Sequence, residues 1–128
     1  MIETLTPDAS APCVLVVDDD AAVRAALGAI LGDLGYAPVA AADGAEALLY
    51  LRGDNPRPCA IVLDLTMPGM NGWEFCDIAR HDPALRSIPI IVSSSEPDPP
   101  DCEVVVPKPV HVDAFTAAVE KVCPRRDD

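Results

Sequence analysis

Carboxylates follow two apolar segments of this chain, and a lysine follows a third. Asp18 and Asp19 come directly after one segment, Asp64 comes directly after another, and Lys108 stands between two prolines after a third. If the segments are parallel strands, their carboxyl ends meet at one edge of a sheet, where such folds bind ligands. Acids crowded there repel one another, and a divalent cation relieves the repulsion. Carboxylate oxygens suit Mg²⁺, so the spacing predicts a magnesium site.

The same residues are suited to phosphoryl transfer. Asp64 is placed to attack phosphorus as a carboxylate nucleophile and to form an acyl phosphate. A metal held by two carboxylates, a backbone carbonyl and waters would stabilise phosphoryl oxygens. Lys108 would supply a positive charge to the phosphoryl group, and Ser94, after a further apolar run, would donate a hydroxyl hydrogen bond.

Each of these residues also has an ordinary explanation when it is taken alone. An aspartate after a strand is often a turn residue or a helix cap, and for Asp20 the cap is favoured. For Asp18 and Asp19 the two readings are evenly balanced. Lys108 alone would be a solvated surface charge, and Ser94 alone a locally bonded hydroxyl. The order and placement of the whole set favour the functional reading.

Composition limits the classes of protein to which the chain can belong. Its 128 residues fit one domain, and half of them are hydrophobic. A net charge of −12 disfavours direct binding to nucleic acid or to an anionic membrane surface. No apolar run is long enough to span a bilayer, and the N-terminus lacks the pattern of a secretory signal. A cytoplasmic location is therefore expected.

The five cysteines give little support to a disulfide framework or a zinc site. Their number is odd, and no pair has the C-x-x-C spacing. Cys13, Cys59 and Cys76 lie in apolar patterns and are expected to be small core residues. Cys102 and Cys123 lie near loops or ends, and nothing beside them indicates a lowered pKa.

Strands alternate with helices along the chain, which predicts βαβ units and a doubly wound parallel sheet. The apolar patterns predict strands over 13–17, 37–41, 60–63, 90–92 and 104–106, and helices over 21–34, from 43 to about 52, 72–81 and 112–122. Asp43 and Glu46 have the spacing of a capping box. In the last helix Val112, Phe115, Val119 and Val122 share one face. We expect one domain over 13–123, between a flexible segment 1–12 and a tail 124–128.

One interval departs from the alternation. Residues 96–102 contain three prolines, which cannot sustain a helix. The interval is also shorter than the usual crossover between parallel strands. We therefore expect an extended coil in place of a helix, or a different position for the strand that follows.

Taken together, the motifs resemble the receiver domains of two-component response regulators. The likeness covers nearly all of the chain from Cys13 to Val122. The matching pieces are Val-Leu-Val-Val-Asp18-Asp19-Asp20, Ile-Val-Leu-Asp64-Leu-Thr-Met67-Pro68-Gly69-Met70-Asn-Gly72, Ile88-Pro-Ile-Ile-Val92 with Ser94, and Pro107-Lys108-Pro109. The resemblance implies a flavodoxin-like α/β fold, a five-stranded sheet in the order 2-1-3-4-5 with helices on both faces.

The resemblance also implies a role for each site residue. Asp64 would accept a phosphoryl group from a kinase phosphohistidine, and the backbone carbonyl of Thr66 would join Asp18, Asp19 and Asp64 around Mg²⁺. Lys108 would contact the phosphoryl group, and its peptide bond to the following proline would be cis. The hydroxyl of Ser94 would turn inward after phosphorylation.

Two features depart from the family pattern, namely the proline-rich interval in place of a fourth helix and Val105 in place of a switching aromatic residue. The leading hypothesis is a stand-alone phosphoacceptor receiver, since a chain ending at Asp128 leaves no room for an output module. It would meet a sensor histidine kinase or a histidine phosphotransfer protein and signal by protein–protein interaction or a phosphorelay. A homodimer is possible, and catalysis would be limited to its own phosphorylation and dephosphorylation.

Two alternatives stay open. The first is an interaction domain that acts without phosphorylation and keeps the site as a relic, which the altered interval favours. The second is a small phosphohydrolase with an aspartyl intermediate, for which the acid two residues after Asp64 is absent, since Thr66 stands there.

Overall fold

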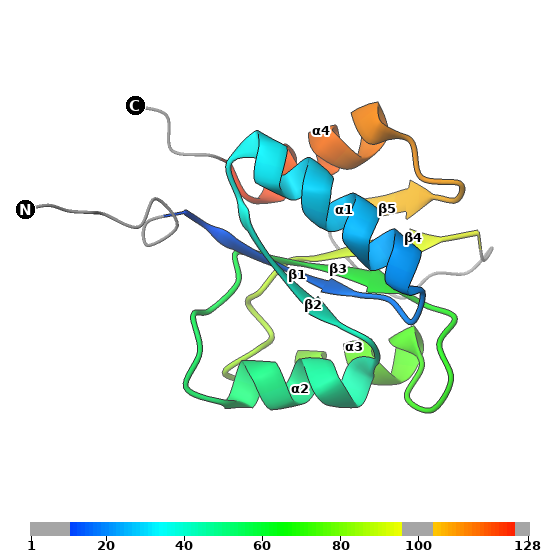
Figure 1. Ribbon diagram of the computed structural model, residues 1–128. Helices are drawn as coiled ribbons and strands as arrows, with labels where there is room; N and C mark the ends of the chain where they lie inside the picture. Colours follow the sequence, from blue (N-terminus) through cyan, green and yellow to red (C-terminus); the bar gives the residue numbers. More distant parts are fainter. Residues whose placement is uncertain (1–10, 96–103, 125–128) are drawn as a thin grey trace, which may run out of the picture.

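Five parallel strands form one central sheet with helices on both faces (Figure 1). The structure, a computed structural model, describes residues 11–95 and 104–124. The strands are β1 (Cys13–Val17), β2 (Ala37–Ala41), β3 (Ala60–Asp64), β4 (Ile90–Ser94) and β5 (Val104–Pro107), and the helices are α1 (Ala21–Leu34), α2 (Gly44–Arg52), α3 (Gly72–Arg80) and α4 (Val112–Val122). The order β2-β1-β3-β4-β5, parallel throughout, confirms the predicted doubly wound fold.

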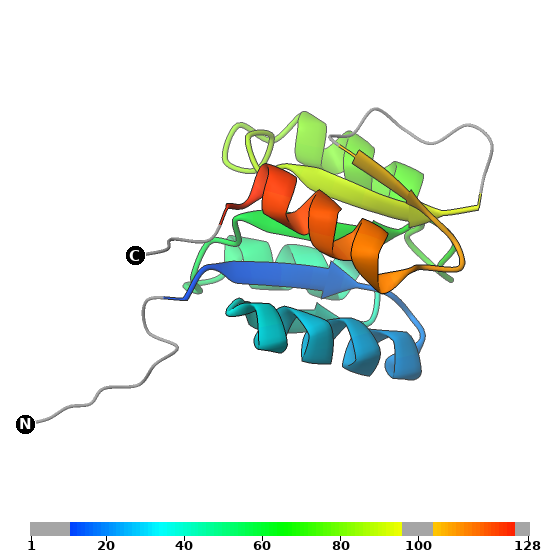
Figure 2. The same ribbon diagram turned by 90° about the horizontal axis from the view of Figure 1, so that it is seen from above.

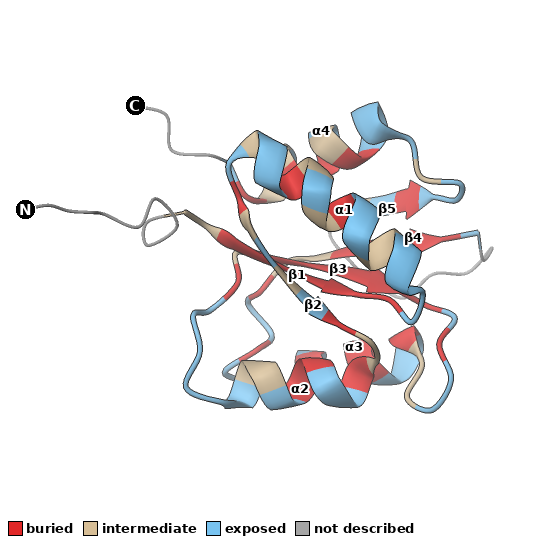
Figure 3. Ribbon diagram, in the orientation of Figure 1, coloured by how far each residue is buried: buried red, intermediate tan, exposed pale blue. Residues whose placement is uncertain are grey.

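The sheet separates two hydrophobic clusters. Helices α1 and α4 lie side by side on one face, and α2 and α3 lie on the other (Figures 1 and 2). Because successive residues of a strand point to opposite faces, Val14 and Val16 enter the first cluster while Leu15 and Val17 enter the second. All residues of β1 and β3 are buried, which explains their continuous apolar sequences (Figure 3).

The helices begin and end at residues whose chemistry suits those positions. The Asp20 carboxylate accepts two backbone N–H bonds at the start of α1, as predicted, and Gly35 ends that helix with φ of 97°. Asn71 and Glu74 form a capping box at the start of α3, which the sequence analysis did not single out. Among the described helices, none combines the length and apolar character needed to cross a membrane.

The capping box predicted for α2 forms in a modified way. The Asp43 carboxylate accepts the Glu46 N–H at 2.8 Å, as expected. The Glu46 carboxylate accepts the N–H of Ala42 at 2.7 Å, whereas a regular box would use the N–H of Asp43. Both acids therefore still satisfy backbone donors at the start of the helix.

The predicted apolar face of α4 is confirmed only beyond its first turn. Phe115 and Val119 are buried, and Val122 packs partly against the same cluster. Val112 is 57% exposed and does not pack against this cluster. The first turn of α4 is exposed throughout, so the burial of this face begins at Phe115 (Figure 3).

The final strand takes the ordinary position of the fold. β5 pairs in parallel with β4, with Val105 opposite Val92, at the edge of the sheet. The expected extended coil over 96–102 lies outside the described residues.

Two cysteines overturn the expectation that a disulfide is poorly supported. Cys59 and Cys123 are bonded to each other, with Cα atoms 5.7 Å apart and a sequence separation of 64. Their pairing depends on the packing of α4 beside β3, which spacing alone does not reveal. Cys13 and Cys76 are free and buried, as expected, and Cys102 lies outside the described residues.

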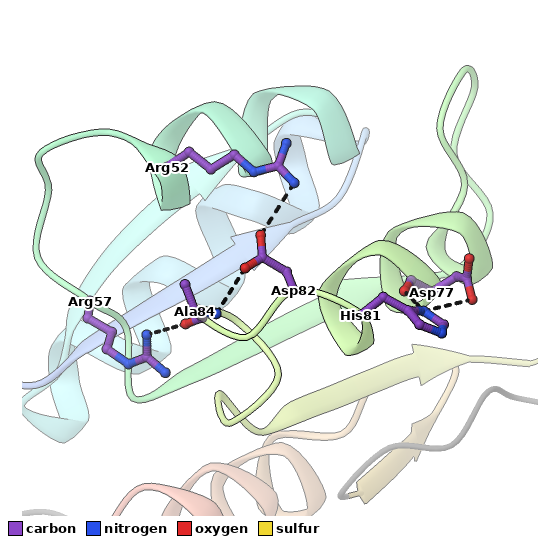
Figure 4. A network of polar contacts seen from close by, with 6 residues as sticks. All are labelled: Arg52, Arg57, Asp77, His81, Asp82 and Ala84. Carbon is purple, nitrogen blue, oxygen red and sulfur yellow. Dashed lines mark hydrogen bonds and ion pairs between the residues drawn. The ribbon is translucent and has the colours of Figure 1, made fainter.

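A polar network ties the end of α2 to the segment after α3 (Figure 4). Arg52 contacts the Asp82 carboxylate at 3.4 Å, and Arg57 donates to the backbone carbonyl of Ala84. His81, which ends α3, contacts Asp77. Exposed ion pairs of this kind contribute little to stability, so the network serves mainly to fix loop geometry.

Candidate functional site

Three aspartates meet at the carboxyl edge of the sheet. One carboxylate oxygen from each of Asp18, Asp19 and Asp64 lies within 4.8 Å of the other two. Asp18 and Asp64 are each only 4% exposed, whereas Asp19 faces solvent. The convergence predicted from the three strand ends is therefore present, with two of the three charges buried.

The turn after β1 holds Asp18 by three contacts. Its carboxylate accepts the Asp20 N–H at 2.9 Å, and its own N–H donates to the Ala41 carbonyl at 3.1 Å. Its backbone carbonyl accepts from the Arg24 guanidinium at 2.8 Å. Sequence reasoning missed Arg24, whose only signal was a basic side chain one helical turn beyond the acids.

Burial raises the pKa of the Asp18 carboxyl above its ordinary value. The Asp20 N–H favours the charged form and lowers this pKa, while the neighbouring charge of Asp64 raises it. Smaller effects follow from Lys108, which lowers the pKa, and from Asp19, which raises it. The site therefore holds a carboxylate whose ionisation is opposed by its surroundings.

Asp64 is paired with the cationic side chain of Lys108. The Lys108 Nζ lies 2.7 Å from Asp64 Oδ1, and the Thr66 N–H donates to the same oxygen at 3.3 Å. Lys108 is aligned through its own N–H, which donates to the Ser94 carbonyl. The peptide bond between Lys108 and Pro109 is cis, as the resemblance implied.

The loop after β3 is fixed at both of its ends. The Gly72 N–H donates to the Leu65 carbonyl at 3.0 Å, and a Cβ atom at Gly72 would lie 2.6 Å from the Leu65 Cα. The chains approach so closely that only glycine fits there. Within the loop, the Met70 side chain packs directly over Gly44 at the start of α2. Thr66 is thereby held beside the acids.

Ser94 lies at the carboxyl end of β4, as predicted, and its residue is buried. In the sheet register it is Ser93, one position earlier, that stands opposite Asp64. Val105 on β5 is 42% exposed, in the position where the resemblance leads one to expect an aromatic switch.

The donor set fits a hard divalent cation. Asp18, Asp19 and Asp64 offer only carboxylate oxygens, which magnesium prefers to nitrogen or sulfur. One open, solvent-facing side at Asp19 leaves room for the water ligands that magnesium retains. Two buried, mutually repelling acids gain most from such an ion, so the geometry matches the predicted metal.

Known proteins resemble this chain over most of its length. The family described as the response regulator receiver domain matches residues 14–120. The alkaline phosphatase synthesis transcriptional regulatory protein SphR of Synechococcus elongatus is 35% identical over 102 residues, 73% of this chain and 39% of that protein. The protein-glutamate methylesterase/protein-glutamine glutaminase 1 of Anaeromyxobacter dehalogenans is 45% identical over 85 residues, 66% of this chain and 23% of that protein. The chain thus spans well under half the length of both relatives.

Solved structures agree with the family match. The Vibrio cholerae chemotaxis protein CheY4, crystallised at low pH, superposes with a TM-score of 0.80 at 28% identity, covering 88% of this chain and 99% of that one. The signal receiver domain of a histidine kinase from Syntrophus aciditrophicus also reaches a TM-score of 0.80, at 26% identity, covering 92% of this chain and 96% of that one. The range 14–120 spans the strand ends that carry the three acids, Ser94 and Lys108. The chain belongs to the response regulator receiver domain family.

Proposed function

We propose that this chain accepts a phosphoryl group on Asp64 from the phosphohistidine of a sensor histidine kinase or a histidine phosphotransfer protein. The observation that carries the proposal is the 2.7 Å contact between Lys108 and the buried Asp64 carboxylate, beside two further acids. Asp64 is a buried acid with a cation at one of its oxygens, and two further acids suited to a metal ion lie beside it. This arrangement is suited to receive a phosphoryl group.

In the proposed step an Asp64 oxygen attacks phosphorus while the bond from phosphorus to the donor imidazole nitrogen breaks. The imidazole keeps the electron pair of the broken bond, and an acyl phosphate remains on Asp64. The Lys108 ammonium then pairs with the phosphoryl oxygens, so the cation that balances Asp64 before transfer balances its product afterwards. Ser94 would donate its hydroxyl to a phosphoryl oxygen.

Asp18, Asp19, Asp64 and the backbone carbonyl of Thr66 would hold Mg²⁺ in this proposal. When bound, the ion would neutralise charge on the phosphoryl oxygens during transfer. The contribution of the chain is positional, because Arg24 and the Asp20 N–H hold Asp18 in place before any ion arrives.

Signalling in this proposal proceeds by contact with other proteins, in the cytoplasm, either directly or through a phosphorelay. The receiver domain itself turns over no substrate except its own acyl phosphate in this proposal. Its net charge of −12 supports protein partners over nucleic acid.

A second function is favoured by one observation, the exposed Val105 on β5. A valine has no ring to exchange between buried and exposed positions, so a phosphorylation signal that depends on such a swing is not available. The alternative is an interaction domain that binds its partner equally well with or without phosphate on Asp64.

The test is labelling with a small phosphodonor such as acetyl phosphate in the presence of Mg²⁺. We expect one alkali-labile phosphoryl group on the wild-type chain and none on Asp64→Asn. Asp54→Asn is the matched control, because Asp54 is an exposed loop residue and its substitution removes the same charge. Equal labelling of the wild type and Asp64→Asn would remove Asp64 as the acceptor.

A beryllofluoride titration separates the two functions. If phosphorylation controls output, binding of this phosphoryl mimic changes the affinity for the partner or the amide spectrum of β4 and β5. If neither changes while labelling of Asp64 succeeds, the chain accepts phosphate without using it as a switch, and the alternative holds.

A further inference from the structure

The bond between Cys59 and Cys123 joins the amino edge of the sheet to the end of the last helix. Cys59 directly precedes β3, and its N–H donates to the Cys13 carbonyl at 2.8 Å. Cys123 ends α4, and its carbonyl accepts the Tyr36 hydroxyl at 2.6 Å. The Cα separation of 5.7 Å lies within the range that a disulfide spans without moving the backbone. The two sulfurs are therefore positioned by groups other than the bond itself.

Contacts other than this bond also hold α4 on the sheet. Phe115, Ala118 and Val119 of α4 are buried in the cluster on the α1 face of the sheet. Because these contacts do not involve the sulfurs, we expect the reduced chain to keep α4 on the sheet with both thiols close together. A pair that is preorganised in both oxidation states is suited to repeated opening and closing.

The two sulfurs differ in access. Cys59 is partly exposed, whereas Cys123 is only 4% exposed. An external thiol or disulfide therefore reaches Cys59 first, and Cys123 is placed to act as the resolving partner. Of the free cysteines that the structure describes, Cys13 and Cys76 are buried, and burial raises the pKa of the Cys13 thiol.

We propose that Cys59 and Cys123 form a reversible thiol–disulfide exchange site for a low-molecular-weight disulfide of the glutathione type. The Cys59 thiolate attacks one sulfur of oxidised glutathione, that disulfide breaks, and one glutathione thiolate leaves with the electron pair. The Cys123 thiolate then attacks Cys59 Sγ and expels the second glutathione thiolate. Two protein thiols are oxidised, one glutathione disulfide is reduced to two thiols, and the two protons pass to these leaving groups.

The consequence is a clamp at one end of α4. The other end of this helix follows the loop that carries Lys108 and its cis bond to Pro109. In the oxidised chain α4 is attached covalently at its C-terminal end, and in the reduced chain packing and the Tyr36 hydrogen bond remain to hold it. The clamp lies at the amino ends of the strands, whereas Asp64 lies at the carboxyl end of β3.

The test uses the full chain equilibrated at a series of ratios of reduced to oxidised glutathione, followed by acid quenching, alkylation and peptide mass spectrometry. We expect Cys59 and Cys123 to lose alkylation together as oxidised glutathione increases, to appear as one linked peptide, and to recover when reduced glutathione is restored. Alkylation of both residues at every ratio would overturn the proposal. So would a bond that opens only after denaturation, because the pair would then be structural.

Variants separate this pair from the other cysteines. Cys123→Ser should leave a single glutathione adduct on Cys59, because no resolving thiol is present. Cys102→Ser is the matched control and should leave the peptide that links Cys59 to Cys123 unchanged. Loss of this linked peptide in Cys102→Ser would show that Cys102 takes part in the pairing. The oxidised wild type should melt roughly 10 °C above the reduced form. Equal melting temperatures would contradict the clamp, although not the exchange chemistry.

Discussion

Replacing Asp18 by asparagine should stabilise the metal-free protein. Asp18 and Asp64 are both buried, and their carboxylate oxygens lie within 4.8 Å of each other. The amide oxygen of asparagine can still accept the Asp20 N–H, so the substitution removes the charge while it keeps the hydrogen bond. The acid cluster thus lowers stability in the absence of a cation.

The magnitude follows from the separation of the charges. Two unit charges 4.8 Å apart repel by about 3.5 kcal/mol at an effective dielectric constant of about 20, and by about 0.9 kcal/mol in bulk water. Lys108, 2.7 Å from Asp64, offsets part of this repulsion. We therefore expect Asp18→Asn to raise the free energy of unfolding by about 1 to 3 kcal/mol.

The assay is urea denaturation of the wild type and the variant, first with a chelator and then with saturating Mg²⁺. Magnesium at about 100 times its dissociation constant should stabilise the wild type by about 2.7 kcal/mol, and should stabilise Asp18→Asn less because one ligand charge is lost. Asp54→Asn controls for the change in net charge, since Asp54 is exposed and outside the site.

Two results would refute this reasoning. If Asp18→Asn is less stable than the wild type in chelator, the carboxylate makes a favourable interaction that outweighs repulsion. If Asp18→Asn and Asp54→Asn gain the same stability, the effect is that of net charge and the cluster has no special role.

Three further outcomes are expected. The stability advantage of Asp18→Asn over the wild type should disappear as the pH falls through the raised pKa of Asp18 towards 3.8. In this range Asp18 of the folded wild type binds a proton while Asp18 of the unfolded chain is still ionised, so the wild type gains stability. Urea titrations across this pH range measure the effect. Arg24→Gln should weaken Mg²⁺ binding by roughly tenfold, because a charged hydrogen bond worth about 1.5 kcal/mol to the Asp18 carbonyl is lost. Arg24→Lys should restore part of the Mg²⁺ affinity, and calorimetry measures both variants. Gly72→Ala should lower stability by about 1 to 3 kcal/mol in thermal denaturation, because its Cβ meets the Leu65 backbone.

Each of these outcomes can fail in a distinct way. A pH-independent difference would mean that Asp18 titrates alike in the folded and unfolded chains. If Arg24→Gln has unchanged Mg²⁺ affinity, the guanidinium contributes to the stability of the fold and not to metal binding. A fully stable Gly72→Ala would mean that the loop moves aside from Leu65 without cost.

The fold could be predicted from sequence because local signals agreed with one another. The continuous apolar runs of β1 and β3 indicated strands buried on both faces, and Asp20 and Gly35 marked both ends of α1. The convergence of Asp18, Asp19 and Asp64 followed from the rule that parallel strands end at one edge. These inferences needed no knowledge of which side chains touch.

What sequence could not supply depends on contacts between distant elements. The pairing of Cys59 with Cys123 requires α4 to end beside the start of β3. In the sequence Arg24 is only one of several basic residues. Its role is visible only in the structure, where α1 places its guanidinium on the Asp18 carbonyl. Val112 has the helical spacing of a core residue, yet the first turn of α4 is exposed.

The loop between β3 and α3 bears on how quickly the site can respond. It is joined to Leu65 through Gly72, to Asp64 through the Thr66 N–H, and to α2 through Met70 over Gly44. A loop restrained in this way loses little conformational entropy when an ion arrives, and its ligands need no slow rearrangement. If the site takes up Mg²⁺ as proposed, its uptake should then require no slow movement of this loop.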